Sequence, residues 1–250
     1  MENDKGVKGT IQDFKLKGCT IQLYESPELF RPNATTRLFT KAMEIREGDV
    51  VFDIGSGVGP LAIWAAKQPC KRVHAVEIIL EQCERLKMNA ELNEVGDRIE
   101  IYNGSLLDPI PSGLLANVVM ADVSGISERP ARMLGWYPSS IPTGGIDGTE
   151  TTVQLLEQAG AYMAEGGRLY FPVAVGLADE DKIMKVARAN FGRLEEKVSV
   201  DFPLSKEEGE RVLEGAEPFI HLNKRRDSSS TRAFTWRGNI YEATEPVHRG

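Results

Sequence analysis

The sequence has 250 residues, of which 41% are hydrophobic, and it carries a formal net charge of −7 at pH 7. This length allows one sizeable core, and the acidic balance disfavours nucleic acid as a partner, because binding to a phosphate backbone depends on lysine and arginine. No run approaches the roughly 18 apolar residues that cross a bilayer, and the first residues lack the apolar core of a secretory signal. We therefore expect a cytoplasmic chain with no membrane partner. The three cysteines lack C-x-x-C spacing and are expected to be reduced.

From residue 49 onward, short runs rich in β-branched residues alternate with longer segments of helical period. The runs predict strands at 49–54, 72–77, 98–103, 116–122, 168–175, 194–200 and 233–242. Helices are expected to begin at Pro60, to span 80–93 and 179–191, and to fill the segment between Gly148 and Gly166. Such alternation is typical of an α/β Rossmann-like three-layer sandwich, with a mostly parallel seven-stranded sheet and helices on both faces.

The first predicted strand ends in a glycine-rich turn that is preceded by a carboxylate. Asp53 stands at the tip of the strand, and Gly55, Ser56, Gly57 and Gly59 follow it into the next helix. Glycines let a ligand lie directly against the backbone, and the unpaired N–H groups of a helix start favour an anionic group. Because Asp53 can face a cation at the same place, the turn predicts a ligand that carries both charges.

A second carboxylate, Glu77, ends the next predicted strand, 24 positions after Asp53, where it can accept both hydrogen bonds of a ribose diol. A dinucleotide site also combines glycines with such an acid, but Pro60 stands at the third glycine position of G-x-G-x-x-G. The pattern D-x-G-x-G-x-G is satisfied throughout. S-adenosylmethionine (SAM) is therefore the predicted cofactor, and a turn that merely packs tightly is the alternative.

With these motifs the chain resembles the class I SAM-dependent methyltransferases over residues 24–175. The resemblance implies that Ser105 and Leu106, in the segment after the third strand, flank the adenine of SAM. It also implies that the strand ending at Asp122 points toward the methyl group. The fold, the cofactor and the activity of a methyltransferase are expected on this basis.

Within this class the chain resembles the enzymes that methylate glutamine in release factors or lysine in a ribosomal protein. Residues 24–28 and 32–37, which include Thr36, are similar to the lead-in that helps to cover the cofactor in those enzymes. Residues 144–148 are similar to a glycine-rich turn that precedes a later helix. Ordinary turn chemistry is the alternative explanation of these segments.

The organisation that follows from this resemblance is a single domain. Residues 1–48 are interpreted as the lead-in over the cofactor site, and 49–250 as the methyltransferase domain. Within the latter, 203–232 is expected to form a lid or a loop. The short basic run at 224–226 opens into Asp227 and three serines, so we interpret it as a solvated loop tip.

The chain departs from the resemblance where the fourth strand ends. The glutamine methyltransferases carry Asn-Pro-Pro-Tyr there, whereas this sequence has Asp122-Val123-Ser124-Gly125. An ionised aspartate accepts hydrogen bonds but donates none, so the site favours an N–H or O–H nucleophile over an amide carbonyl. The lead-in is also too short for a separate protein-recognition domain. Both points predict a small-molecule acceptor, methylated on nitrogen or, as the weaker alternative, on oxygen.

Asp122 is the predicted catalytic residue, which orients or deprotonates the acceptor, with a helix-capping or turn role as the alternative. Ser124, Trp136 and Tyr137 are candidate substrate-binding residues, although the two aromatic rings are equally suited to a core. No metal is expected, because no histidine or cysteine cluster has ligand spacing. The sequence thus predicts a SAM-dependent methyltransferase. It leaves open the oligomeric state, a protein side chain as acceptor, and a SAM-binding regulatory subunit without turnover.

Overall fold

The computed structural model describes residues 10–24, 29, 32–137, 139, 141–224 and 232–247. Its strands are β1 (Ile11–Leu16), β2 (Cys19–Tyr24), β3 (Val50–Ile54), β4 (Arg72–Glu77), β5 (Ile99–Asn103), β6 (Ala116–Met120), β7 (Met163–Val175), β8 (Phe191–Leu204), β9 (Asn223–Lys224) and β10 (Phe234–Pro246). Its helices are α1 (Ala34–Ala42), α2 (Pro60–Ala66), α3 (Leu80–Leu92), α4 (Glu128–Met133), α5 (Glu150–Gln158), α6 (Glu180–Asn190) and α7 (Lys206–Leu213), with 3-10 turns at Gly96–Arg98 and Ala159–Tyr162.

The main sheet has the order β5-β4-β3-β6-β7-β10-β8, and β9 pairs with the start of β10. The five strands from β5 to β7 are parallel, whereas β10 runs antiparallel to both β7 and β8. The predicted α/β class with a mostly parallel sheet is confirmed. The sheet has eight strands and not the predicted seven, because the two-residue strand β9, in the segment interpreted as a lid or loop, pairs with Phe234 and Thr235.

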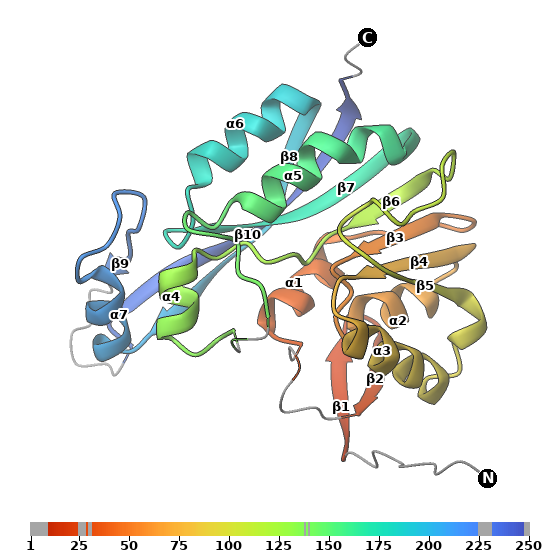
Figure 1. The fold of residues 1–250 in the computed structure, drawn as a ribbon, viewed down its shortest axis with the longest axis horizontal. Helices are drawn as coiled ribbons and strands as arrows, with labels where there is room; N and C mark the ends of the chain where they lie inside the picture. Colours follow the sequence, from red (N-terminus) through yellow and green to blue (C-terminus); the bar gives the residue numbers. More distant parts are fainter. Residues whose placement is uncertain are drawn as a thin grey trace.

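Helices cover both faces of the sheet, as predicted (Figure 1). On one face α1, α2 and α3 contribute to a core that contains Val51 and Met120. On the other face α5 and α6 pack over a second core that contains Phe52 and Val119. Neighbouring residues of β3 therefore point into different cores, which explains why residues 50–52 of the strand are all apolar. Within the described residues, no helix is long and apolar enough to cross a membrane.

Three helices lie in segments that were expected to be lead-in or loop, namely α1, α4 and α7, as does the β1/β2 hairpin. α1 begins after Asn33, whose side chain accepts hydrogen bonds from the N–H groups of Thr35 and Thr36. α7 begins with a capping box, in which the side chains of Ser205 and Glu208 each accept from the backbone N–H of the other residue. These are sequence signals of a helix start, but each helix is too short for its periodicity to be evident. Residues 25–28 and 225–231, on which parts of the predictions fall, lie outside the described residues.

The β1/β2 hairpin is tied to α3 by two asparagine side chains. Asn89 and Asn93 accept hydrogen bonds from the backbone N–H groups of Tyr24 and Gln22, at 2.9 and 3.0 Å. The Asn89 amide also donates to the carbonyl of Val58 in the glycine-rich turn, at 2.9 Å. One side chain therefore connects the amino-terminal hairpin with a turn that is remote from it in sequence.

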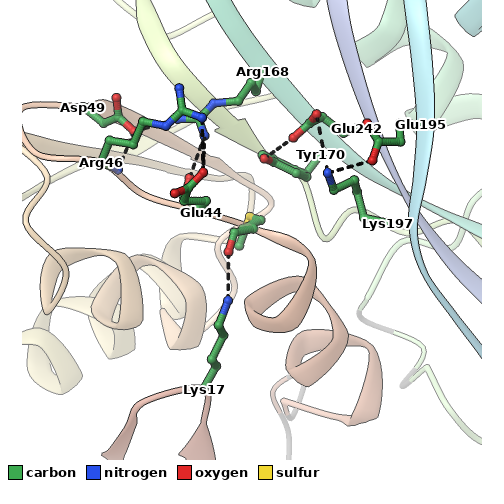
Figure 2. A network of polar contacts seen from close by, with 10 residues as sticks. Lys17, Glu44, Arg46, Asp49, Arg168, Tyr170, Glu195, Lys197 and Glu242 are labelled. Atoms are coloured by element: carbon green, nitrogen blue, oxygen red, sulfur yellow. Dashed lines mark hydrogen bonds and ion pairs between the residues drawn. The ribbon is translucent and has the colours of Figure 1, made fainter.

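A polar network lies at the other end of β3 from the glycine-rich turn (Figure 2). The buried Arg168 guanidinium of β7 lies 2.8 Å from the carboxylate of Asp49, which directly precedes β3, and donates to the carbonyl of Glu44 at 3.0 Å. Beside it, the Tyr170 hydroxyl donates to the carboxylate of Glu242 in β10. Arg168 thus joins the segment between α1 and β3 to β7, and the contact of Tyr170 with Glu242 joins β7 to β10.

We expect replacement of Arg168 by leucine to lower the free energy of unfolding by about 3–5 kcal/mol, because it leaves the Asp49 carboxylate buried without its cation. Replacement of Arg193 by leucine should change it by less than about 1 kcal/mol, because the ion pair of Arg193 with Glu195 is exposed. Urea denaturation of both variants measures the two values. Equal effects would show that the buried pair contributes no more than a surface pair.

Candidate functional site

The glycine-rich turn after β3 requires glycine at two positions for different reasons. Gly57 has a φ of +55°, a left-handed conformation in which other residues are strained. A Cβ atom on Gly59 would lie 2.6 Å from Cγ of Leu86, so this glycine lets α2 approach α3 closely. The Ser56 hydroxyl lies 2.9 Å from the carbonyl oxygen of Asp53 and donates within the turn itself. The backbone of the turn is therefore held in one conformation, with no side chain at Gly57 or Gly59.

Glu77 at the end of β4 closes this turn from the neighbouring strand. Its carboxylate accepts hydrogen bonds from the backbone N–H groups of Gly57 at 2.8 Å and Ile79 at 2.9 Å, and from the Gln82 amide at 3.4 Å. Burial raises the pKa of Glu77, and the backbone N–H groups act in the opposite direction. Because a carboxylate offers about four lone pairs, Glu77 is a fixed acceptor with capacity left for a ligand.

Asp53 lies at the base of the turn. The residue is fully buried, and neither carboxylate oxygen makes a hydrogen bond of normal geometry. Burial raises the pKa of Asp53 well above its usual range, and the carboxylates of Asp122 and Glu77 raise it further, whereas the backbone N–H of Ala62 acts in the opposite direction. A buried polar group without a partner is destabilising, and so its presence needs an explanation. An ammonium group would satisfy these oxygens, so the residue fits the amino-acid end of SAM.

A cavity of about 630 Å³ opens beside the turn, along the carboxyl ends of the parallel strands. The predicted site residues that line it are Gly55, Gly57, Glu77, Ser105, Leu106, Asp122, Ser124, Trp136 and Tyr137. A small cavity of about 30 Å³ shares Gly55, Gly57 and Asp122 with it and is also bordered by Asp53, Ser56 and, from α1, Thr36. Gly59 borders neither of these two cavities. The fold therefore brings the residues predicted for cofactor and acceptor to one place.

Asp122 follows β6 and borders both cavities. One of its carboxylate oxygens accepts a hydrogen bond from the Thr36 hydroxyl at 3.0 Å, and that hydroxyl accepts from the backbone N–H of Asn33 at 3.3 Å. Burial raises the pKa of Asp122 to about 6, and the bond from Thr36 acts to lower it. Asp122 is therefore ionised at neutral pH and is more basic than a surface carboxylate.

Ser124 and Tyr137 border the same cavity beyond Asp122. The Ser124 hydroxyl donates to the carbonyl of Pro142 at 2.7 Å. Burial raises the pKa of Tyr137 to about 12; the charge of Asp122 adds to this effect, and a hydrogen bond with Ser124 opposes it. Tyr137 therefore remains a neutral hydroxyl, next to a carboxylate that is ionised.

Phe202 and Trp236 also line the large cavity, although sequence reasoning did not select them. They lie directly opposite each other in the antiparallel pair β8/β10, with ring centroids 4.5 Å apart. Trp136 lies 5.8 Å from Trp236. The sequence holds no local signal for this grouping, because it depends on the register of strands that are more than 30 residues apart.

No metal site is evident in the described part of the chain, where no group of three or more His, Cys, Asp or Glu side chains is arranged to hold an ion. Cys19, Cys70 and Cys83 are free thiols. His74 lies in β4 with Nδ1 3.0 Å from the Tyr102 hydroxyl, and burial lowers its pKa. It is a packed residue of the sheet and does not border the two cavities.

Residues 14–128 match the model of the TRM5/TYW2 methyltransferase domain. The chain is 31% identical over 147 residues to a ribosomal protein L11 methyltransferase of Bacillus cytotoxicus, covering 56% of this chain and 47% of the relative. It is 28% identical over 145 residues to a release factor glutamine methyltransferase of Rhodopirellula baltica, covering 56% of this chain and 49% of the relative. The chain spans about half the length of these relatives. The solved tRNA m1G37 methyltransferase of M. jannaschii is 16% identical, with a TM-score of 0.53 over 95% of this chain and 58% of that one.

These comparisons contradict the predicted partners. The similar proteins are named for a ribosomal protein, a release factor and a tRNA, so the predictions of a small-molecule acceptor and of nucleic acid as a disfavoured partner are both wrong. The prediction took the short lead-in at 1–48 as evidence against a separate domain that recognises a protein acceptor. The structure has α4, α7 and β9 gathered beyond the ends of the long strands β7, β8 and β10, at the left of Figure 1. A recognition surface at that end was not considered.

The family match covers the glycine-rich turn, Glu77 and Asp122, and ends at the first residue of α4. The predicted enzyme class, its cofactor SAM and its Rossmann-like sheet agree with the family model and with the similar proteins. In sequence over residues 14–128 and in fold over nearly its whole length, the chain is therefore similar to the class I SAM-dependent methyltransferases.

Proposed function

We propose that this protein transfers the methyl group of SAM to a nitrogen atom of a protein side chain, and that this nitrogen belongs to an amine and not to an amide. The observation that supports this most is the single cavity of about 630 Å³, which joins Gly57 and Glu77 at one end to Asp122, Ser124 and Tyr137 beyond them. A cofactor and an acceptor have to meet within one water-excluding space for a displacement at carbon.

The chain's own residues would hold SAM at three points. Asp53 would accept hydrogen bonds from the amino group, and Glu77 from the ribose hydroxyls. Ser105 and Leu106, which line the cavity after β5, would flank the adenine. When bound, SAM supplies an electrophilic methyl group on a positively charged sulfur.

Asp122 would orient the acceptor by accepting a hydrogen bond from its nitrogen. Burial lowers the pKa of an amine and raises that of Asp122, so a proton moves between them more readily than in water. In the proposed step Asp122 would accept a proton from the acceptor ammonium. The freed lone pair would form a bond to the methyl carbon while the bond between that carbon and sulfur breaks. The products would be a methylated ammonium group and S-adenosylhomocysteine, and Asp122 would return its proton to solvent.

A protein side chain is the proposed acceptor because the curated relatives named above are named for protein acceptors. The charged residues that line the cavity, Glu77 and Asp122, are both acids, and this suits a cationic side chain.

The acceptor class can be tested with radiolabelled SAM and two substrate pools from a host strain that lacks this gene, one of total protein and one of tRNA. We expect label in the protein pool that protease removes, at a side-chain amine located by mass spectrometry. Label that ribonuclease removes would assign a nucleic acid acceptor instead. Absence of transfer to either pool by a protein that binds SAM would favour a regulatory subunit.

The affinity for SAM is expected to rise with pH and to be linked to proton release. The unliganded protein keeps Asp53 protonated to a higher pH than usual, whereas an ammonium ligand favours the ionised form. Binding therefore releases a proton, and affinity is lost as pH falls through the raised pKa of Asp53. Calorimetry in two buffers of different ionisation enthalpy, repeated over a series of pH values, measures the protons released.

Asp53→Asn should abolish this proton release and weaken SAM binding about 10- to 100-fold, the scale of a hydrogen bond to a charged group. Asp97→Asn, at an exposed carboxylate, is the matched control and should change neither quantity. Unchanged affinity and proton release in Asp53→Asn would remove Asp53 from the cofactor site.

Asp122→Asn should lower turnover with the identified acceptor by about 10²- to 10⁴-fold if the carboxylate accepts the proton, because the amide keeps the shape but is not a base. The turnover of the unmodified protein should rise with pH through about 6 as Asp122 ionises. Asp181→Asn, on the exposed surface of α6, is the control. Normal turnover in Asp122→Asn, or a loss of SAM affinity as large as that of Asp53→Asn, contradicts this role.

A further inference from the structure

The part of the large cavity that lies beyond Asp122 is bordered by aromatic rings from three separate segments. Trp136 follows α4, Phe202 lies near the end of β8, and Trp236 lies near the start of β10. We call these three residues the aromatic wall. All of them lie outside residues 14–128, the part of the chain that matches the family model. The wall is therefore a feature of this chain that its likeness to the family does not explain.

Backbone geometry fixes the wall. The rings of Phe202 and Trp236 are stacked, with centroids 4.5 Å apart and planes at 22°, and Trp136 is tilted by 43° against Trp236 at 5.8 Å. A Cβ atom on Gly238 would lie 2.6 Å from Cε2 of Phe202, so a glycine is needed for the ring to lie flat over β10. The positions of Phe202 and Trp236 are therefore set by the strand pairing and by the space above Gly238.

Two helices support the wall from behind. Val212 of α7 packs in the same apolar cluster as Trp236. The Arg129 side chain of α4 donates to the carbonyls of Val212 and Glu214 at the end of α7, and Arg211 of α7 donates to the carbonyl of Met133 at the end of α4. Each arginine thus caps the carbonyl end of the other helix, where a cation is favoured. The wall is preorganised.

The electrostatics of the cavity select a cation. None of the described residues that line it is Lys, Arg or His, whereas Glu77 and Asp122 are acids. The face of an aromatic ring is also negative and attracts an ammonium group within about 6 Å of its centroid. Acid and ring act in the same direction, so the part of the cavity beside Asp122 and the rings attracts an alkylammonium group and disfavours an anionic one.

We infer that the aromatic wall determines acceptor specificity by holding the alkylammonium group of the acceptor against its rings, beside Asp122. This inference rests on the proposed function and deepens it. Trp136, Phe202 and Trp236 would bind the charged form of the acceptor before Asp122 takes its proton. The hydrocarbon stem of a side chain would lie along the same rings, which exclude water from it.

Choline and 3,3-dimethylbutan-1-ol are suitable probes, because they have nearly the same shape and differ in charge. Both are titrated by calorimetry or ligand-observed NMR into the complex of the protein with S-adenosylhomocysteine, which lacks the positive sulfur of SAM. We expect choline to bind about 3- to 30-fold more tightly than the alcohol, the range of cation–π attraction. Phe202→Leu and Trp236→Leu, which keep an apolar side chain, should lower this ratio, and the part that remains comes from the acids Asp122 and Glu77. Phe14→Leu is the control, because Phe14 is a half-buried ring of the β1/β2 hairpin outside the cavity.

Equal binding of choline and the alcohol would overturn the inference. The same holds if the ratio of the two affinities is unchanged in both Phe202→Leu and Trp236→Leu. If methyl transfer to the protein pool persists in that case, the proposed function stands and only the aromatic wall is reassigned to packing. Guanosine serves as a third probe. Guanosine binding that is tighter than choline binding, and that is lost in Trp236→Leu, would overturn both the cationic acceptor and the choice of a protein substrate.

Discussion

Three carboxylates, those of Asp53, Glu77 and Asp122, lie at the carboxyl ends of neighbouring parallel strands with no cation among the described residues that line the cavities. Burial raises the pKa of each of them. Ionisation of several buried carboxylates is unfavourable without an opposite charge nearby. The same constraint therefore supports both proposed cationic ligands, the amino group of SAM and an amine acceptor.

The two ends of β3 show how the fold tolerates this strain. Asp49, just before the strand, has Arg168 at 2.8 Å, whereas Asp53, within the strand, has no partner for either oxygen. Tyr170 and Glu242 add a further contact beside the paired end, between β7 and β10. The ion pair at the amino end of β3 thus contributes to stability, whereas the Asp53 carboxylate near the carboxyl end makes no hydrogen bond of normal geometry. Departures from satisfied burial are typical of functional sites and have to be compensated elsewhere in a fold.

Sequence reasoning recovered what is local. The strand at 72–77 and the helix near 80–93 are predicted within one residue of β4 and α3, because buried parallel strands read as apolar runs and the helix has a clear period. The glycines and Glu77 follow from spacing within one β-turn-α-β unit, whereas the place of Asp122 was predicted from the resemblance to the class I methyltransferases. The contact of Thr36 with Asp122 and the stacking of Phe202 on Trp236 depend on long-range packing, so no local pattern predicts them. The cap at Ser205 was a readable signal of α7 that the sequence analysis overlooked.

Most of the residues that were predicted from sequence lie in the part of the chain assigned to the cofactor, whereas Phe202 and Trp236, which were not predicted, lie in the part assigned to the acceptor. The family match stops at residue 128. Up to that point the chain carries Asp122 and also the turn and Glu77, for which we propose contacts with groups that are the same in every SAM molecule. Beyond it come α4, α7 and the antiparallel strands that form the aromatic wall. An acceptor differs between enzymes that share a cofactor, so the surface that selects it has to be free to change. Placing that surface on β8 and β10 lets it vary without disturbing the parallel strands that hold the cofactor, because β10 contacts them only through β7.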